Sequence, residues 1–139
     1  MADYLFVCSR DSFKTTIMHK VIGFYDFNTK IDEILKGIQI GDKIYCYITK
    51  EKVLDAYFEV DKLPFLDDKP IYDDRDVVYA LRIGVKLKKR GKQIDFKKHI
   101  APKLDLIKRK DISYAAYFVQ TLQKLNEKDA KFLLDLMNQ

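Results

Sequence analysis

The sequence predicts one α+β domain in which a β-barrel of about five to six strands is decorated by helices. Two observations predict this fold class: runs with strand character fill the middle of the chain, and helical patterns occupy its two ends. The 139 residues are a common length for one domain, and the 47% hydrophobic content can build a core without a metal or disulfide. We therefore expect a single domain over residues 1–139.

The expected strands are short runs rich in β-branched and aromatic residues, at residues 4–8, 43–48, 53–60, 77–87 and 94–96. Residues 49–52 form a hairpin turn between the second and third of these strands. Gly84 is typical of a bulge or a barrel bend. The polar, Pro-containing stretches 63–70 and 73–76 predict a long surface loop that carries Tyr72.

The expected helices follow from capping residues and apolar spacing. The first begins at Asp11 or Ser12 and runs to about His19, and the second is capped by Asn28 or Thr29 and ends at Gly37. Residues 113–122 combine good helix formers with an apolar face, whereas residues 104–107 fit either a helix or a strand. The last helix is capped by Asn126 and buries a stripe made of Ala130, Leu133, Leu134 and Met137.

The N-terminal residues do not have the basic start of a secretory signal, and no segment approaches the roughly 20 apolar residues that span a membrane. Cys8 and Cys46 each lie in an apolar, strand-like run. We expect two buried, reduced thiols in a cytoplasmic protein, with a disulfide as the alternative.

The charges are distributed unevenly along the chain. The net charge is +5, yet residues 86–110 hold eleven Lys or Arg against Asp95 and Asp105, a local charge of +9. Residues 51–76 hold nine acids against four bases. One face is therefore expected to meet a polyanion, the alternative being that the basic stretch 86–92 is a solvated hairpin.

Residue patterns for catalysis or metal binding are absent from the sequence. His19, His99 and the two cysteines lack the spacing of a zinc site, and the glycines never group as a phosphate-binding loop. No local motif supplies a base for Cys8 or Ser9 as a nucleophile. We expect no catalytic residue, no metal and no cofactor, and hence a protein that is not an enzyme.

Aromatic residues are abundant, with nine Tyr and nine Phe but no Trp. Phe24, Tyr25 and Phe27 surround Gly23, and Tyr114 and Tyr117 follow the basic stretch. Aromatic faces beside positive charge suit the stacking of nucleic-acid bases. The alternative is that these rings are core residues, and we prefer this alternative for Phe27 and Tyr117.

Four stretches in order resemble the EVE domain, specifically its small stand-alone archaeal or bacterial proteins: YLFVCSRDSF (4–13), HKVIGF (19–24), IGDKIYCY (40–47) and KRKDISY (108–114). The resemblance covers nearly the whole chain. It implies a PUA-like β-barrel with a pocket similar to that of YTH-type and SRA-type readers of modified bases. The chain departs from the family pattern at Ile22, where relatives carry Trp, and at Tyr114, where the aromatic residue near Ser113 is displaced.

The resemblance implies a base pocket bounded by Ser9, Ile22, Gly23, Phe24, Asn28, Ser113 and Tyr114. A flipped base, normal or modified, would stack on Phe24 or Tyr114 while Ser9 and Asn28 bond its edge. The expected phosphate-binding residues are Arg10, Lys88, Lys89, Arg90, Lys92, Lys108, Arg109 and Lys110. The predicted partner is RNA or DNA; the alternatives are a small-molecule or nucleotide-binding protein that uses the same pocket, and a nucleic-acid-modifying enzyme.

Overall fold

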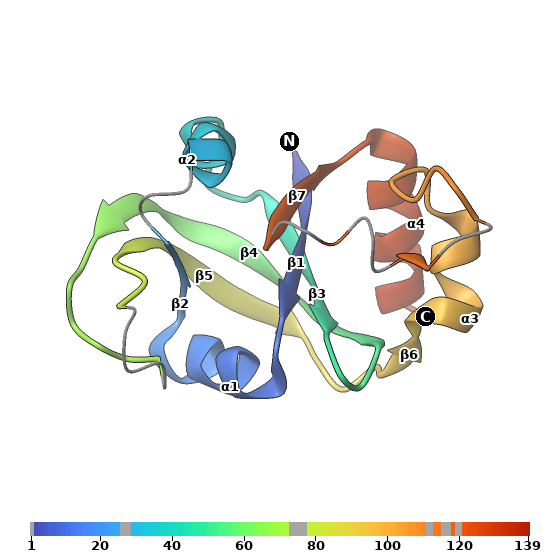
Figure 1. Cartoon of the computed structure of the whole chain (residues 1–139), viewed down its shortest axis with the longest axis horizontal. Coiled ribbons are helices and arrows are strands. Elements are labelled where there is room, and N and C mark those ends of the chain that lie inside the picture. Colours follow the sequence, from blue (N-terminus) through green and yellow to red (C-terminus); the bar gives the residue numbers. More distant parts are fainter. Residues whose placement is uncertain (1, 26–28, 73–77, 111–112, 115–117, 119–120) are drawn as a thin grey trace.

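The computed structural model describes residues 2–25, 29–72, 78–110, 113–114, 118 and 121–139 (Figure 1). Strands and helices follow one another as β1 (Asp3–Cys8), α1 (Arg10–His19), β2 (Val21–Phe24), α2 (Thr29–Lys36), β3 (Lys43–Ile48), β4 (Val53–Leu66), β5 (Leu81–Lys89), β6 (Ile94–Asp95), α3 (Phe96–His99), a 3₁₀ turn (Ala101–Lys103), β7 (Leu122–Leu125) and α4 (Glu127–Met137). The mixed order of strands and helices agrees with the predicted α+β class.

The strands form one curled sheet in the order β2-β5-β4-β3-β1-β7, and β6 pairs with the start of β4 (Figure 1). β1 and β3 are parallel, with Leu5 opposite Tyr45, whereas the other pairs are antiparallel. A parallel pair needs a long crossover, which α1, β2 and α2 supply here. The predicted barrel of about five to six strands decorated by helices is confirmed as a curled, barrel-like sheet, which has seven strands in the described part of the chain.

Each side of the sheet has its own apolar core. On one side α1 and α2 contribute Phe13 and Ile31, and on the other side α3 and α4 contribute Phe96 and Leu133 (Figure 1). Alternate residues of the central strands serve the two cores, because side chains in a strand point to opposite faces. Tyr47 of β3 therefore points to the α3 and α4 side.

Helix caps agree with the prediction at one end of the chain and differ at the other. Asn126 caps α4, as expected, by accepting a hydrogen bond from the Asp129 N–H at 2.8 Å. The cap of α1 is Ser9, not Asp11 or Ser12, and its hydroxyl oxygen accepts a hydrogen bond from the Ser12 N–H at 3.1 Å. Helix α1 thus begins directly where β1 ends.

Two expected elements are corrected. Leu122, expected at the end of a helix, begins β7 and lies opposite Phe6 of β1, while most of residues 115–120 lie outside the described residues. Residues 63–66, expected in a loop, continue β4 against β5. In both places pairing with a distant strand decides the backbone conformation, and such pairing leaves no local signal.

Gly84 and the cysteines agree with the sequence. Gly84 lies opposite Lys62 at an irregular register of β4 and β5, and an added Cβ would lie 2.4 Å from the Lys62 Cβ. The close approach of the two strands therefore requires glycine. Cys8 and Cys46 are both buried free thiols, as predicted.

Candidate functional site

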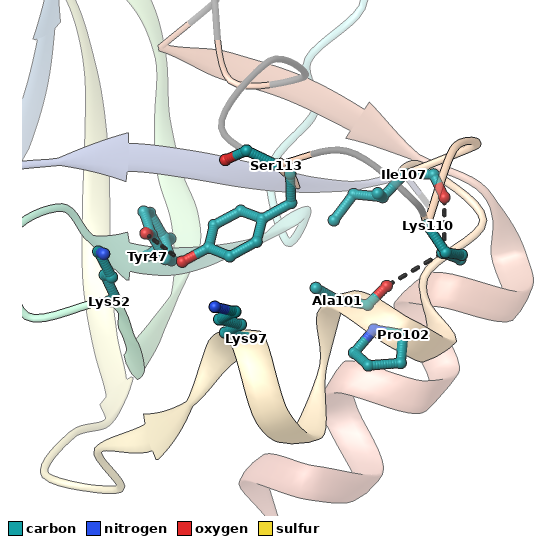
Figure 2. A pocket seen from close by; sticks show the side chains of 9 residues that line it. Tyr47, Lys52, Lys97, Ala101, Pro102, Ile107, Lys110 and Ser113 are labelled. Atoms are coloured by element: carbon teal, nitrogen blue, oxygen red, sulfur yellow. Dashed lines mark hydrogen bonds between the residues drawn. The ribbon is translucent and has the colours of Figure 1, made fainter.

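A hollow of about 560 Å³ opens between the end of β3 and the segment that contains α3 and the 3₁₀ turn (Figure 2). We call it the lysine–tyrosine hollow and define it by its lining residues: Tyr47, Lys52, Lys97, Ala101, Pro102, Ile107, Lys110, Ser113 and Tyr114. These residues combine aromatic surface with ammonium groups. None of the described lining residues is acidic.

Backbone contacts place the two lysines at one side of the hollow. Lys52 ends the β3–β4 turn in the left-handed region, with a φ of 56°. The Phe96 N–H donates to the Lys52 carbonyl at 3.0 Å, which ties the start of α3 to this turn. Lys97 directly follows Phe96, so both ammonium groups lie near Tyr47 (Figure 2).

The opposite wall is held by a buried carboxylate. Asp129 of α4 is 1% exposed and accepts hydrogen bonds from the Asp105 N–H at 2.8 Å and the Leu106 N–H at 2.9 Å. Because both bonds go to backbone amides, they fix the chain that leads from the 3₁₀ turn to Ile107. The hollow thus lies between two walls whose backbones are hydrogen-bonded to the rest of the fold.

Four rings pack together at the floor of the hollow: Tyr47, Phe96, Tyr114 and Phe118, with centroid separations from 4.7 to 6.0 Å. The hydroxyl oxygens of Tyr47 and Tyr114 lie 2.9 Å apart. Burial and this hydrogen bond raise the pKa of Tyr47, so its phenol stays neutral at physiological pH. One hydroxyl donates to the other, which leaves one O–H of the pair as a donor.

The three lysines of the hollow are not equivalent. Lys110 Nζ donates to the carbonyl oxygens of Ala101, Leu104 and Ile107, which uses all three of its N–H bonds. By contrast, Lys52 and Lys97 have no ion-pair partner among the residues that the structure describes. These two ammonium groups are therefore available to an anion, while Lys110 contributes charge at longer range.

Several predicted residues gather at or near this hollow. Ser113, Tyr114 and Lys110 line it, and the exposed residues Lys108 and Arg109 directly precede Lys110. The other basic group, Lys88, Lys89, Arg90 and Lys92, lies at the end of β5 and in the turn that leads to β6. This turn is close to the start of β4, since the Lys92 N–H donates to the Asp55 carbonyl at 3.3 Å. The Lys92 ammonium group itself donates to the carbonyl of Gln139.

Arg10 does not have the environment expected of a phosphate-binding residue. Its guanidinium donates twice to Glu51, at 2.8 and 2.6 Å, and once to Asp55, at 2.6 Å. Asp55 is buried and also accepts a hydrogen bond from the Gly91 N–H at 3.0 Å. Arg10 thus links α1 to the β3–β4 turn and to the start of β4, and its charge is matched by two carboxylates. This geometry corrects the expected phosphate contact.

The residues expected to form the base pocket at β2 are placed apart from the hollow. Ile22 and Phe24 are 0% and 2% exposed, and the Phe24 ring packs against Phe6 at 6.3 Å. A buried ring has no face for a base, which corrects the expected stacking on Phe24. The Ser9 hydroxyl serves as the α1 cap, and Asn28 lies outside the described residues.

Gly23 is covered by a side chain that sequence reasoning left in a loop. The Gly23 N–H donates to the Tyr72 hydroxyl at 2.8 Å. Lys52 and Lys97 were likewise missed, because neither stands in a motif. The sole hint was that Lys52 follows an aromatic strand at a turn, a weak signal in a lysine-rich chain.

Within the described ranges, His, Cys, Asp and Glu side chains nowhere gather in the groups of three that could hold a metal ion. The described helices include none that is long and apolar enough to cross a membrane.

The curled sheet with helices on both sides is also the fold of solved YTH domains and of human THYN1. Human THYN1, solved with 5-methylcytosine-containing DNA, is 15% identical, with a TM-score of 0.64 over 100% of this chain and 99% of that one. The Pho92 YTH domain, solved with m6A, is 14% identical, with a TM-score of 0.72 over 99% of this chain and 86% of that one.

A third similar structure is the Mmi1 YTH domain in complex with RNA, 11% identical, with a TM-score of 0.67 over 99% of this chain and 77% of that one. No protein-family model and no curated protein matches the chain. At these identities the structural similarity establishes the fold.

Proposed function

We propose that the chain is a non-catalytic nucleic-acid-binding module whose phosphate contacts centre on the lysine–tyrosine hollow. The observation that carries the proposal is a pair of ammonium groups, Lys52 and Lys97, that have no ion-pair partner among the described residues and lie beside the Tyr47–Tyr114 hydroxyl pair. Ammonium groups hold phosphates without regard to base sequence. The remaining phenolic O–H is a further donor to a phosphate oxygen.

The hollow also offers a surface for a base. Its volume of about 560 Å³ lies within the roughly 300–1,000 Å³ of small-molecule pockets, and Tyr114, Pro102 and Ile107 give it apolar surface. A base that contacts an aromatic side chain gains roughly 1–3 kcal/mol. In this proposal Lys52 and Lys97 hold the phosphate, and Tyr114 contacts the attached base.

The exposed basic residues on either side extend the proposed path of the nucleic acid. They are Lys88, Lys89 and Arg90 before β6, and Lys108 and Arg109 beside Lys110. Single-stranded nucleic acid is the favoured form, because its bases can leave the strand with a small unstacking cost.

The structural neighbours support this class of ligand. THYN1 was solved with DNA that contains 5-methylcytosine, and the YTH domains with RNA and with m6A. We extend that ligand class, including a modified base, to this chain as part of the proposal. Membership of the stand-alone EVE type, base contacts by Ser9 and Asn28, and a cytoplasmic location stay predictions.

A second candidate function is the binding of a free nucleotide, favoured by the size of the hollow. A mononucleotide would meet the same two lysines and the same tyrosine. Mass spectrometry of small molecules released from the purified protein separates the two functions, because a stoichiometric free nucleotide favours the second.

The proposed function is tested by fluorescence anisotropy with labelled single-stranded RNA and DNA 12-mers at several salt concentrations. We expect binding that weakens linearly on a log–log plot as salt rises, with a slope of about −0.7 for each phosphate contacted. Absence of binding to both 12-mers at low salt, or binding without a salt slope, would contradict the proposal.

A further inference from the structure

The side chain of Tyr72 is inserted between α1 and β2. Its hydroxyl accepts a hydrogen bond from the Gly23 N–H at 2.8 Å and lies 3.5 Å from the Val21 carbonyl oxygen. Burial raises the pKa of this phenol, which therefore stays neutral at physiological pH. We call the place it occupies the Tyr72 seat, formed by Thr16, Val21, Gly23 and Tyr79.

The seat exists because residue 23 is a glycine. A Cβ added there would lie 2.7 Å from Tyr72 Cε2 and 2.9 Å from the Tyr79 carbonyl oxygen. Any side chain at this position would therefore push the ring out. The absence of a side chain leaves the flat ring of Tyr72 directly against the backbone of β2.

The seat presents polar groups that a phenol does not fully use. Thr16 is 0% exposed, and its hydroxyl oxygen has no hydrogen-bond partner among the described residues. A buried polar group without a partner destabilises the fold and calls for a structural reason.

Together the polar groups of the seat match one edge of a nucleobase. Gly23 supplies an N–H donor, Val21 a carbonyl acceptor and Thr16 a hydroxyl that can donate or accept. The Tyr79 ring closes one side, with its centroid 5.4 Å from that of Tyr72. A base edge likewise places an acceptor beside a donor, and its ring is flat like the phenol.

The chain before and after Tyr72 is held in place by the side chain of Arg82. The buried Arg82 guanidinium donates to the Tyr79 carbonyl at 3.2 Å and to the Lys69 carbonyl, and lies 3.3 Å from the Asp67 carboxylate. These contacts anchor the chain before and after Tyr72. The ring can therefore leave its seat while β4 and β5 remain paired.

We propose that Tyr72 is an internal competitor that keeps the seat at β2 closed to a nucleobase, so that a base binds there only by displacing the phenol. This inference rests on the proposed nucleic-acid-binding function and concerns its regulation. The Thr16 hydroxyl, which has no hydrogen-bond partner among the described residues, is then the group that a bound base satisfies.

Free nucleosides test the inference, because they carry a base but no phosphate and so bypass the lysines. Calorimetry or NMR titration is done with cytidine, 5-methylcytidine, adenosine and N6-methyladenosine. We expect wild type to bind these nucleosides weakly and Tyr72→Ala to bind at least one of them ten times more tightly or better. Tyr25→Ala, which removes a tyrosine that is 48% exposed, is the matched control and is expected to bind like wild type.

Two results would overturn the inference: a folded Tyr72→Ala variant with no gain for any nucleoside, or wild type that already binds as tightly as the variant. If Tyr72→Ala does not fold, Tyr72→Phe replaces it, since it keeps the ring and removes the hydroxyl. For Tyr72→Phe we expect a gain of threefold or more together with a nucleoside-dependent shift of the Gly23 amide resonance. Lack of both would overturn the inference.

The proposed function and this inference are tested by different measurements. The salt dependence of oligonucleotide affinity tests the lysines of the hollow, whereas a gain in nucleoside affinity in Tyr72→Ala tests the seat alone. The double variant Lys52→Ala/Lys97→Ala in the Tyr72→Ala background should keep the nucleoside gain. If the gain disappears there, the nucleosides bind in the hollow and the inference is wrong.

Discussion

The lysine–tyrosine hollow and the Tyr72 seat are two concave places on opposite sides of one sheet, and they differ in what fills them. The hollow is open, and two of its ammonium groups lack partners among the described residues. The seat holds the chain's own phenol, which accepts the Gly23 N–H. The resemblance pointed to β2 as the base pocket, whereas open space and free charge are found at the hollow.

The basic side chains of the molecule also differ in whether their charged groups already have partners in the fold. Arg10 is matched by Glu51 and Asp55, and Lys110 by three carbonyl oxygens, whereas Lys52 and Lys97 have no ion-pair partner in the described part of the chain. The number of basic residues in a segment therefore does not identify the candidates for phosphate binding. The candidates are identified by which basic side chains lack a carboxylate or carbonyl partner in the described part of the fold.

The largest expected effect separates a structural cation from a binding one. Arg10→Ala leaves the buried Asp55 carboxylate without its guanidinium partner, and we expect a loss of roughly 2–3 kcal/mol in the free energy of unfolding. This is less than for a fully buried pair, because the Arg10 side chain is 25% exposed. Urea denaturation measures the loss. A stable variant with strongly reduced oligonucleotide affinity would instead make Arg10 a phosphate-binding residue.

The next effect concerns Lys52 and Lys97, the two lysines of the hollow without an ion-pair partner among the described residues. We expect Lys52→Ala/Lys97→Ala to weaken binding of a single-stranded 12-mer about tenfold, which is about 1.4 kcal/mol, and to reduce the salt slope by about 1.4. The free energy of unfolding should not change. Lys131→Ala, which removes an exposed lysine of α4, is the control with the same loss of charge. Equal weakening by the control would show a diffuse effect of net charge.

A smaller effect is expected from the hydroxyl pair. Tyr114→Phe removes the bond to Tyr47 but keeps the ring, so we expect a loss of about 1 kcal/mol in stability and an oligonucleotide affinity within about twofold of wild type, since stacking needs the ring alone. Thermal unfolding and anisotropy give the two values. The Tyr47 hydroxyl remains in this variant as a donor to phosphate, so a large loss of affinity would mean that the Tyr114 hydroxyl itself contacts the ligand.

The smallest effect is a dependence on pH. Arg10 lowers the pKa of Glu51, so Glu51 binds a proton less readily in the folded chain than in the unfolded one. Its contribution to stability is therefore present above the ordinary Glu pKa and is lost as the pH falls through the lowered value. The difference in unfolding free energy between wild type and Glu51→Gln should be constant near neutrality and shrink below about pH 4.5. A difference that grew on acidification would contradict a stabilising ion pair between Arg10 and Glu51.

Local patterns in the sequence predicted the parts of the fold that depend on local interactions. The hairpin of β3 and β4 and the Asn126 cap follow from neighbouring residues and were found as expected. Leu122 was misassigned to a helix because its partner, Phe6, is far away in the chain. Pairing between distant strands overrides helix propensity without leaving a trace in the sequence.

The candidate site was predictable in part for the same reason. Ser113, Tyr114 and Lys110 stand together in the sequence and line the hollow together. Lys52 reaches it from the β3–β4 turn and Lys97 from α3, and one backbone hydrogen bond from Phe96 joins the two segments. Tyr72 reaches Gly23 across 49 residues, a contact that no spacing rule reveals.

The claim that nucleic acid binds at the hollow is tested most directly by an NMR titration of the ¹⁵N-labelled protein with an unlabelled single-stranded RNA 8-mer. We expect the largest amide shifts at Lys52, Lys97, Ser113 and Tyr114, with smaller shifts along residues 88–92. Shifts confined to α2 and the far end of β4, with the hollow unaffected, would contradict it.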